Sequence, residues 1–201
     1  MLKSYLIQVL KNFNEDKKKK FAGHPLAAFL RNEFPNYLKN ITNNPDDYTF
    51  SGSAGRGQWT YSPWVAVLNS KITDSVQKGF YVVYLFREDM EGVYLSINQG
   101  TIKLLDANKH LKDKEVKTQE TLKFRAGEYR KKLNQNLTKD LLKEIDLGVV
   151  KSKYGNYYEA GNIFAKYYSL KNMPSEEELE SDFKKFMDLY ATIIKKTRKI
   201  S

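Results

Sequence analysis

The sequence predicts a single α+β domain in which a central, mostly antiparallel sheet is flanked by helices at the N- and C-terminal ends of the chain. Three observations predict this class. Apolar residues recur at helical spacing near both ends, short runs of β-branched and aromatic residues fill the centre, and no Pro-rich or low-complexity linker divides the 201 residues. We therefore take residues 1–201 as one domain with a strand-rich centre at 48–100.

The first 40 residues are expected to form two helices joined by a basic loop. One apolar stripe predicts a helix that ends near Phe13: Leu2, Tyr5, Leu6, Val9, Leu10 and Phe13. The four lysines at 17–20 repel one another, which favours a solvated loop over a DNA contact. His24-Pro25 then introduces a second helix over residues 26–40.

The central strands follow from residue type. Three runs rich in β-branched and aromatic residues predict strands at 64–68, 80–86 and 93–97. The polar, glycine-ended segment 88–92 predicts a hairpin, so the last two strands should pair in antiparallel fashion.

The C-terminal half is expected to contain a charged helical stretch at 106–145, a strand-like stretch at 154–168 and a helix at 175–198. The last helix is the best supported, because Ser175 and Glu178 form a capping box after Pro174. Apolar residues continue at helical spacing after it: Leu179, Phe183, Phe186, Met187, Tyr190 and Ile194.

The charge distribution points to a polyanionic partner. The formal net charge of +10 divides into +5 over residues 1–40, −2 over 41–102, +6 over 103–155 and +1 over the remainder. Basic helical lobes at 1–40 and 103–150 therefore surround a nearly neutral centre. This layout suits a protein that contacts phosphates at its edges and does something other than Coulomb attraction in the middle.

Several functions are disfavoured by what the sequence lacks. It has no cysteine, and its two histidines, His24 and His110, have no metal-ligand spacing, so we expect no metal and no cofactor. The glycine-rich segment 52–57 is not followed by the Lys-Ser/Thr of a phosphate loop. No nucleophile and base stand at a recognisable spacing, so we expect no catalytic residues. No apolar run approaches the ~20 residues of a membrane span, and we expect a cytoplasmic protein with no membrane contact.

Aromatic residues gather where turns meet strands: Trp59, Tyr61, Trp64, Tyr81, Tyr154, Tyr157 and Tyr158. Such rings offer flat faces on which a base stacks, worth roughly 1–3 kcal/mol per base. The alternative is that they fill the core, which is the usual role of Trp and Tyr in sheets.

Four segments together resemble a known family. Residues 55–68, 78–86, 93–100 and 153–158 are similar in order, spacing and motif to the N-terminal DNA-recognition domain of McrB-type modification-dependent restriction proteins. The resemblance extends over essentially the whole chain. It implies a reader of double-stranded DNA that extrudes a modified base, with 5-methylcytosine expected, into a pocket. It also implies two partners, a GTP-hydrolysing motor domain in the same protein and a nuclease subunit.

The resemblance implies that Trp64, Leu85 and Tyr154 wall this base pocket, and the apolar Leu85 suits a methyl group. We add Tyr81 and Arg56 to the base-contacting set. Arg56 stands where some relatives have an aromatic residue inside a Gly-x-Gly loop, so the preferred modification is left open.

Contacts to the DNA backbone are expected from Lys78, Ser62, Lys151 and Lys153, together with the lysine-rich region 103–132. Two other functions remain open on the sequence alone. The chain could bind RNA or single strands on the same aromatic residues, or it could be an interaction module whose basicity is incidental.

Overall fold

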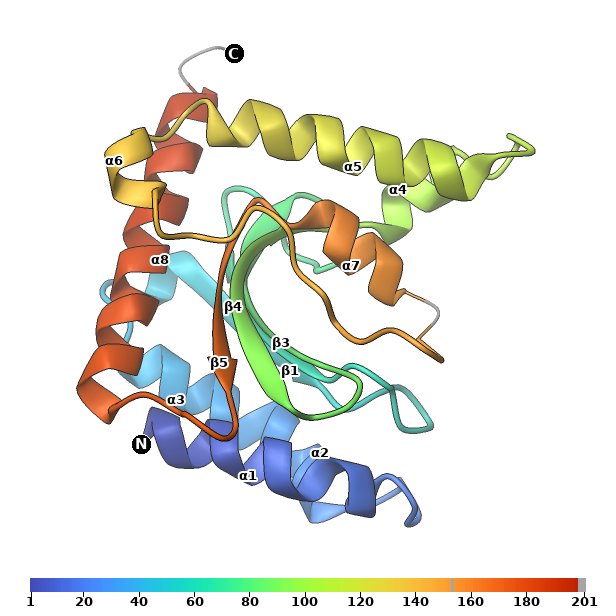
Figure 1. The fold of residues 1–201 in the computed structure, drawn as a ribbon, viewed down its shortest axis with the longest axis vertical. Helices are drawn as coiled ribbons and strands as arrows, with labels where there is room; N and C mark the ends of the chain where they lie inside the picture. Colours follow the sequence, from blue (N-terminus) through green and yellow to red (C-terminus); the bar gives the residue numbers. More distant parts are fainter. Residues whose placement is uncertain (153, 199–201) are drawn as a thin grey trace.

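The computed structural model describes residues 1–152 and 154–198, and it has the α+β fold that the sequence predicts (Figure 1). Its five strands form one antiparallel sheet in which spatial order follows chain order. They are β1 (Tyr48–Ser53), β2 (Trp64–Asn69), β3 (Phe80–Phe86), β4 (Gly92–Gln99) and β5 (Phe164–Ser169). The strands predicted at 64–68, 80–86 and 93–97 are confirmed.

The register brings two candidate site residues together. In the β3–β4 hairpin, Phe86 pairs with Val93, which confirms the predicted turn between these strands. In the neighbouring β2–β3 pair, Trp64 lies opposite Leu85. Residues directly opposite each other in an antiparallel pair present their side chains on the same face, so these two are neighbours.

The N-terminal helices differ from the prediction in the length of the first and the regularity of the second. Helix α1 (Leu2–Asp16) continues three residues past Phe13. The segment predicted as one helix over 26–40 consists of α2 (Pro25–Ala28), a π-helical turn η1 (Phe29–Glu33) and α3 (Phe34–Asn40). The widened turn comes just before Pro35, which has no N–H for the helical ladder. A short 3₁₀ turn η2 (Pro45–Asp47) leads into β1.

The described part of the connection between β4 and β5 contains four helices, α4 (Ile102–Ala107), α5 (Lys114–Arg130), α6 (Gln135–Thr138) and α7 (Gly155–Gly161). The prediction that residues 154–168 are strand-like is therefore wrong in its first half. Tyr157 and Ala160 of α7 pack against Leu122 of α5, and this tertiary contact outweighs the β propensity of the tyrosines. A Cβ on Gly161 would lie 2.6 Å from Asn98 Oδ1, so glycine allows α7 to end close against β4.

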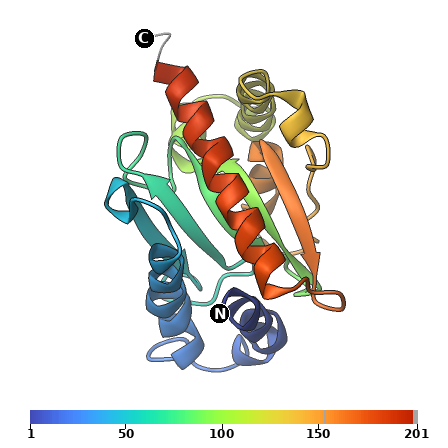
Figure 2. The same ribbon diagram turned by 90° about the vertical axis from the view of Figure 1, so that its left-hand side faces the viewer.

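Helix α8 (Glu176–Arg198) confirms the predicted C-terminal helix. The Ser175 hydroxyl accepts a hydrogen bond from the Glu178 N–H at 3.2 Å, as the capping box requires. Figure 2 shows α8 crossing the sheet, with the start of α1 near its lower end. The two helices are joined there because the Glu176 carboxylate accepts hydrogen bonds from the N–H groups of Leu2 and Lys3.

The two faces of the sheet are covered differently. The face that we call the α8 face is packed by α1, α3 and α8 and holds the main hydrophobic core. The opposite α7 face is covered by α7 and by residues 145–152, which we call the strap. Its apolar cluster is smaller and is bordered by the half-buried Trp64 and Tyr158.

Candidate nucleic-acid interface

A small hollow lies on the α7 face over β2 and β3, and three of the five predicted base-pocket residues line it. Its volume is about 30 Å³. The lining residues are Trp64, Val76, Tyr81, Val83, Leu85, Thr101, Ile102 and Tyr158. None of these residues carries a formal charge at neutral pH, so the hollow presents an aromatic and apolar surface.

The side chains of the hollow are held in defined positions. Trp64 and Leu85 face each other across the β2–β3 ladder. The Tyr81 hydroxyl donates a hydrogen bond to the Val76 carbonyl at 3.1 Å. Burial raises the pKa of Tyr158 to about 12, so its phenol is neutral at physiological pH. The Tyr158 carbonyl accepts from Asn98 Nδ2 at 2.9 Å, which fixes this turn of α7 over β4.

The other two predicted base-pocket residues lie outside the hollow. Tyr154 is the N-cap residue of α7, and its ring centroid lies 6.4 Å from that of Tyr157 in the cluster between α5 and α7. Arg56 is exposed in the loop between β1 and β2. Tyr158 is among the aromatic candidates that the sequence singles out but not among the predicted pocket residues. A helical interpretation of residues 155–161 would have put it one turn after Tyr154.

The loop between β1 and β2 is anchored by Trp59. Its indole N–H donates to the Lys19 carbonyl at 2.9 Å, and its ring packs edge-on against Phe13 and Phe21. This aromatic residue therefore serves the packing of the loop against the α1–α2 connection. Gly55 has a φ of 126°, which an L side chain rarely adopts, so the backbone path of the loop requires glycine there.

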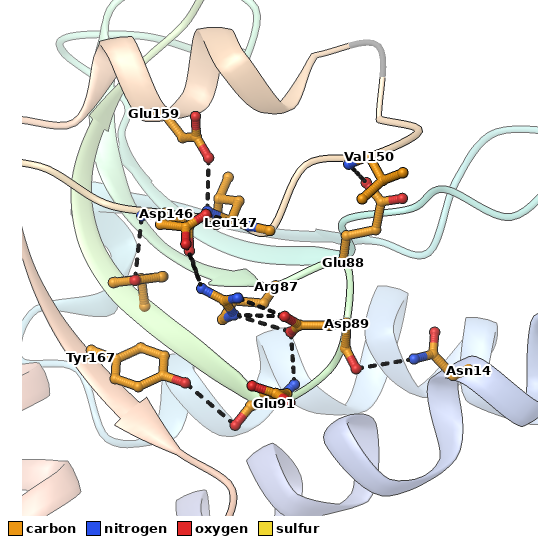
Figure 3. A network of polar contacts seen from close by, with 12 residues as sticks. Asn14, Arg87, Glu88, Asp89, Glu91, Asp146, Leu147, Val150, Glu159 and Tyr167 are labelled. Atoms are coloured by element: carbon orange, nitrogen blue, oxygen red, sulfur yellow. Dashed lines mark hydrogen bonds and ion pairs between the residues drawn. The ribbon is translucent and has the colours of Figure 1, made fainter.

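Glu88 fixes the end of the strap. It follows β3 and is 8% exposed, and its carboxylate accepts hydrogen bonds from three consecutive backbone N–H groups. The distances are 3.0 Å from Val150, 2.9 Å from Lys151 and 3.1 Å from Ser152. Figure 3 shows Glu88 and Val150 in this arrangement. One buried acid thus satisfies three donors that would otherwise lack partners at this turn.

Arg87 fixes the start of the strap (Figure 3). Its guanidinium donates to the Asp146 carbonyl at 2.6 Å and to the Asp89 carboxylate at 2.6 Å. Hydrogen bonding from Arg87 lowers the pKa of Asp89 below its ordinary value. From α7, Glu159 accepts the Leu147 N–H at 2.7 Å, and burial raises the pKa of this carboxyl. Polar contacts therefore hold the strap over the sheet.

Basic side chains lie near both ends of the hollow. Lys78 is exposed, two residues after Val76, and pairs with Asp74 at 3.1 Å. Lys151 is exposed beside Glu88, which comes three residues after Leu85. The predicted contact Lys153 lies outside the described residues.

Lys17 joins the Lys151 end of this surface. Its ammonium lies 4.9 Å from the ring centroid of Tyr61. Burial lowers the pKa of Lys17, with Glu88 acting to raise it and Lys151 to lower it. This lysine therefore contributes a second positive charge near Lys151.

Ser62 is placed differently from the other predicted backbone contacts. Its side chain is 1% exposed, and its hydroxyl has no hydrogen-bond partner within the described part of the chain. In this conformation the hydroxyl does not reach solvent, so we leave Ser62 out of the proposed interface.

The described residues contain neither a metal-binding cluster nor a membrane-spanning helix. Over residues 1–152 and 154–198, no group of three or more His, Asp or Glu side chains is arranged to hold a metal ion. Within the same residues, the helices are too short or too polar to cross a bilayer.

Comparison with known proteins gives one result that covers nearly the whole chain. A search of curated proteins finds no match. The model of the family described as "MrcB-like, N-terminal domain" matches residues 8–195, from the second turn of α1 to the last turns of α8. This span contains the whole sheet, the hollow and the strap, and the chain therefore belongs to the MrcB-like N-terminal domain family.

Proposed function

We propose that this domain is the DNA-recognition module of a modification-dependent restriction protein, and that it reads a modified base, with 5-methylcytosine expected, by accepting it in the hollow on the α7 face. One observation carries the proposal. The uncharged hollow formed by Trp64, Leu85, Tyr81 and Tyr158 has cationic side chains near both of its ends. Family membership supports the same function.

The chemistry of the hollow suits a base that has left the helix. Extrusion costs a few kcal/mol of unstacking, and contact with an aromatic ring returns roughly 1–3 kcal/mol per base. The indole of Trp64 and the phenol of Tyr158 supply such rings, and Leu85 offers an apolar contact for a methyl group. Lys78, Lys151 and Lys17 would neutralise phosphates on either side.

The hollow must widen to receive a base. Its volume of about 30 Å³ is smaller than a nucleobase. Tyr158 is half-buried on a seven-residue helix, whereas Leu85 and Tyr81 stand on a central strand. We therefore assign the movement to the ring of Tyr158, which would swing away from Trp64 as the base enters.

In this proposal the domain recognises DNA, and catalysis is carried out by another domain and another subunit. The cutting of DNA would be carried out by a GTP-hydrolysing motor domain in the same protein and by a nuclease subunit. The recognition step then needs only differential binding of modified and unmodified duplexes.

The test is a binding panel at fixed salt, read by fluorescence anisotropy. Matched duplexes carry cytosine, 5-methylcytosine, 5-hydroxymethylcytosine, 4-methylcytosine or 6-methyladenine. The wild-type domain should prefer one modified duplex, and Trp64→Ala should abolish that preference. Lys151→Ala should weaken modified and unmodified duplexes alike, because a phosphate contact carries no base information.

Trp59→Ala is the matched control, since it removes an equal side chain from the β1–β2 loop and leaves the hollow intact. It should preserve the preference among duplexes. Discrimination retained in Trp64→Ala would contradict the pocket assignment. Tighter binding of single strands than of duplexes, regardless of modification, would replace base extrusion by stacking on an open strand.

A further inference from the structure

A second basic site lies at the beginning of β5, on the opposite edge of the sheet from β1 (Figure 1). It is a cavity of about 490 Å³ beside α6, which we call the α6 groove. Its lining residues are Arg130, Lys131, Leu133, Gln135, Thr138, Lys139, Leu141, Lys143 and Phe164. None of them lines the hollow.

Arg130 is built into the wall of the groove. Its Nε donates to the Ile163 carbonyl at 2.7 Å, and one terminal nitrogen donates to the carbonyls of Lys143 and Asn162 at 2.7 and 2.8 Å. Burial lowers its pKa, but an arginine stays charged at physiological pH. Within the described residues this guanidinium makes no ion pair with a carboxylate, so its positive charge is not neutralised by contact.

The other charged residues of the groove are also basic. Lys131 is paired with Glu128. Lys139 and Lys143 are exposed and make no ion pair with the residues that the structure describes. Three cations, counting Arg130, therefore face one cavity with no acidic partner among those residues.

We propose that the α6 groove binds phosphate groups of a nucleic-acid backbone at a site separate from the hollow. The exposed Gln135 amide is a donor that adds to the three cations, as phosphate oxygens require. The only aromatic residue in the lining, Phe164, is 2% exposed, so the groove offers no open ring on which a base would stack.

The position of the groove determines what it contributes. It lies beside β5, whereas the hollow lies over β2 and β3 on the α7 face. This inference extends the proposed function, because it gives the same module a second contact with the flanking part of the nucleic acid or with another segment. The groove contributes affinity and salt dependence, and the hollow contributes discrimination among bases.

The experiment compares two double variants that each remove two positive charges. Lys139→Gln/Lys143→Gln alters the groove, and Lys39→Gln/Lys184→Gln alters exposed lysines of α3 and α8 outside it. Binding of modified and unmodified 30-base-pair duplexes is measured by anisotropy from low to high salt. All four substitutions are on exposed side chains, and circular dichroism checks that both variants fold.

The groove variant should lower the slope of log affinity against log salt by about 2, because each removed lysine leaves one phosphate without its cation. The ratio of affinities for modified and unmodified duplexes should stay at the wild-type value. The α3/α8 control should keep the wild-type slope.

Each other outcome identifies which proposal fails. If the groove variant has the same salt slope as the wild type and the control, the phosphate site is overturned and the proposed function is unaffected. If the groove variant lowers the salt slope but the wild-type domain does not discriminate among bases, the groove is supported and the base-reading function is overturned. A wild-type domain that binds no duplex at low salt overturns both.

Discussion

The α8 face and the α7 face of the sheet are held by different forces. On the α8 face, long helices bury large aromatic side chains such as Phe183, Phe186 and Tyr190. On the α7 face, the strap is held by hydrogen bonds that Glu88 accepts and Arg87 donates, and Glu159 of the short helix α7 accepts one from Leu147. A large apolar core therefore stabilises the fold on one side, while on the other side directed polar contacts add to a smaller apolar cluster beside the hollow. Under the proposed function, folding and binding therefore depend on opposite faces of the sheet.

Truncation of a core aromatic residue should give the largest effect. Phe183 is 1% exposed, and its ring stacks on that of Tyr84 at 6.3 Å between centroids. Phe183→Ala should lower the free energy of unfolding by about 3–5 kcal/mol in urea titrations. Tyr158→Ala, on the half-buried edge of the α7 face, should cost clearly less. Equal losses in the two variants would contradict the distinction between the faces.

Removal of the acid at the end of the strap comes next. Glu88→Ala leaves the N–H groups of Val150, Lys151 and Ser152 without their carboxylate and should cost about 2–3 kcal/mol. These three amides should lose protection in hydrogen exchange measured by NMR. Glu91→Ala, an exposed acid in the same turn, is the control and should leave them protected. Unchanged protection in Glu88→Ala would show that the strap is held by its apolar contacts.

Two tyrosines test whether the α8 face depends on polar contacts. The Tyr190 hydroxyl donates to the Phe80 carbonyl at 2.9 Å and accepts from the Asn69 N–H at 3.0 Å. Tyr190→Phe should therefore cost about 1–2 kcal/mol of unfolding free energy. The buried Tyr84 hydroxyl has no hydrogen-bond partner within the described residues, so Tyr84→Phe should be neutral or stabilising. Urea unfolding of the pair measures the difference, and equal losses would contradict it.

The smallest effect should be a pH dependence at the start of the strap. Because Arg87 lowers the pKa of Asp89, their interaction adds stability above the ordinary carboxyl pKa, and this contribution is lost as the pH falls through the lowered value. The destabilisation caused by Arg87→Gln should thus be greatest near neutral pH and should shrink below about pH 4. Thermal unfolding at pH 7 and pH 3 measures it. A destabilisation that is independent of pH would assign the role of Arg87 to its bond with the Asp146 carbonyl.

Elements that depend on local pattern could be predicted from the sequence. The strands β2, β3 and β4 follow from runs of β-branched residues, and α8 follows from its capping box and its apolar spacing. Trp64, Leu85 and Tyr81, three of the predicted base-pocket residues, line the same hollow, and their contact with a base stays a prediction.

The remaining parts depend on contacts between distant segments. Helix α7 resembles a strand in composition and is helical because it packs on α5. Because α7 is not expected as a helix, the sequence does not indicate that Tyr158 lines the hollow or that Tyr154 lies in the cluster between α5 and α7. The base-contacting role of Tyr154 stays a prediction. Ser62 is polar and adjoins a predicted strand, yet the fold buries it. No local pattern predicts the strap, because its partners Glu88 and Arg87 lie at the β3–β4 turn, far away in the chain.

The hydrogen bonds from α1 to Glu176 have a consequence for biosynthesis. They join residues 174 and 173 positions apart in the chain, so the acceptor for the first turn of α1 is translated long after that turn has left the ribosome. Until then the free N–H groups at the start of α1 are hydrated by water. Because α8 also packs against the central sheet, the nascent chain completes its core only after nearly all of this sequence has emerged, and chaperones therefore have a long period in which to bind its exposed apolar strands.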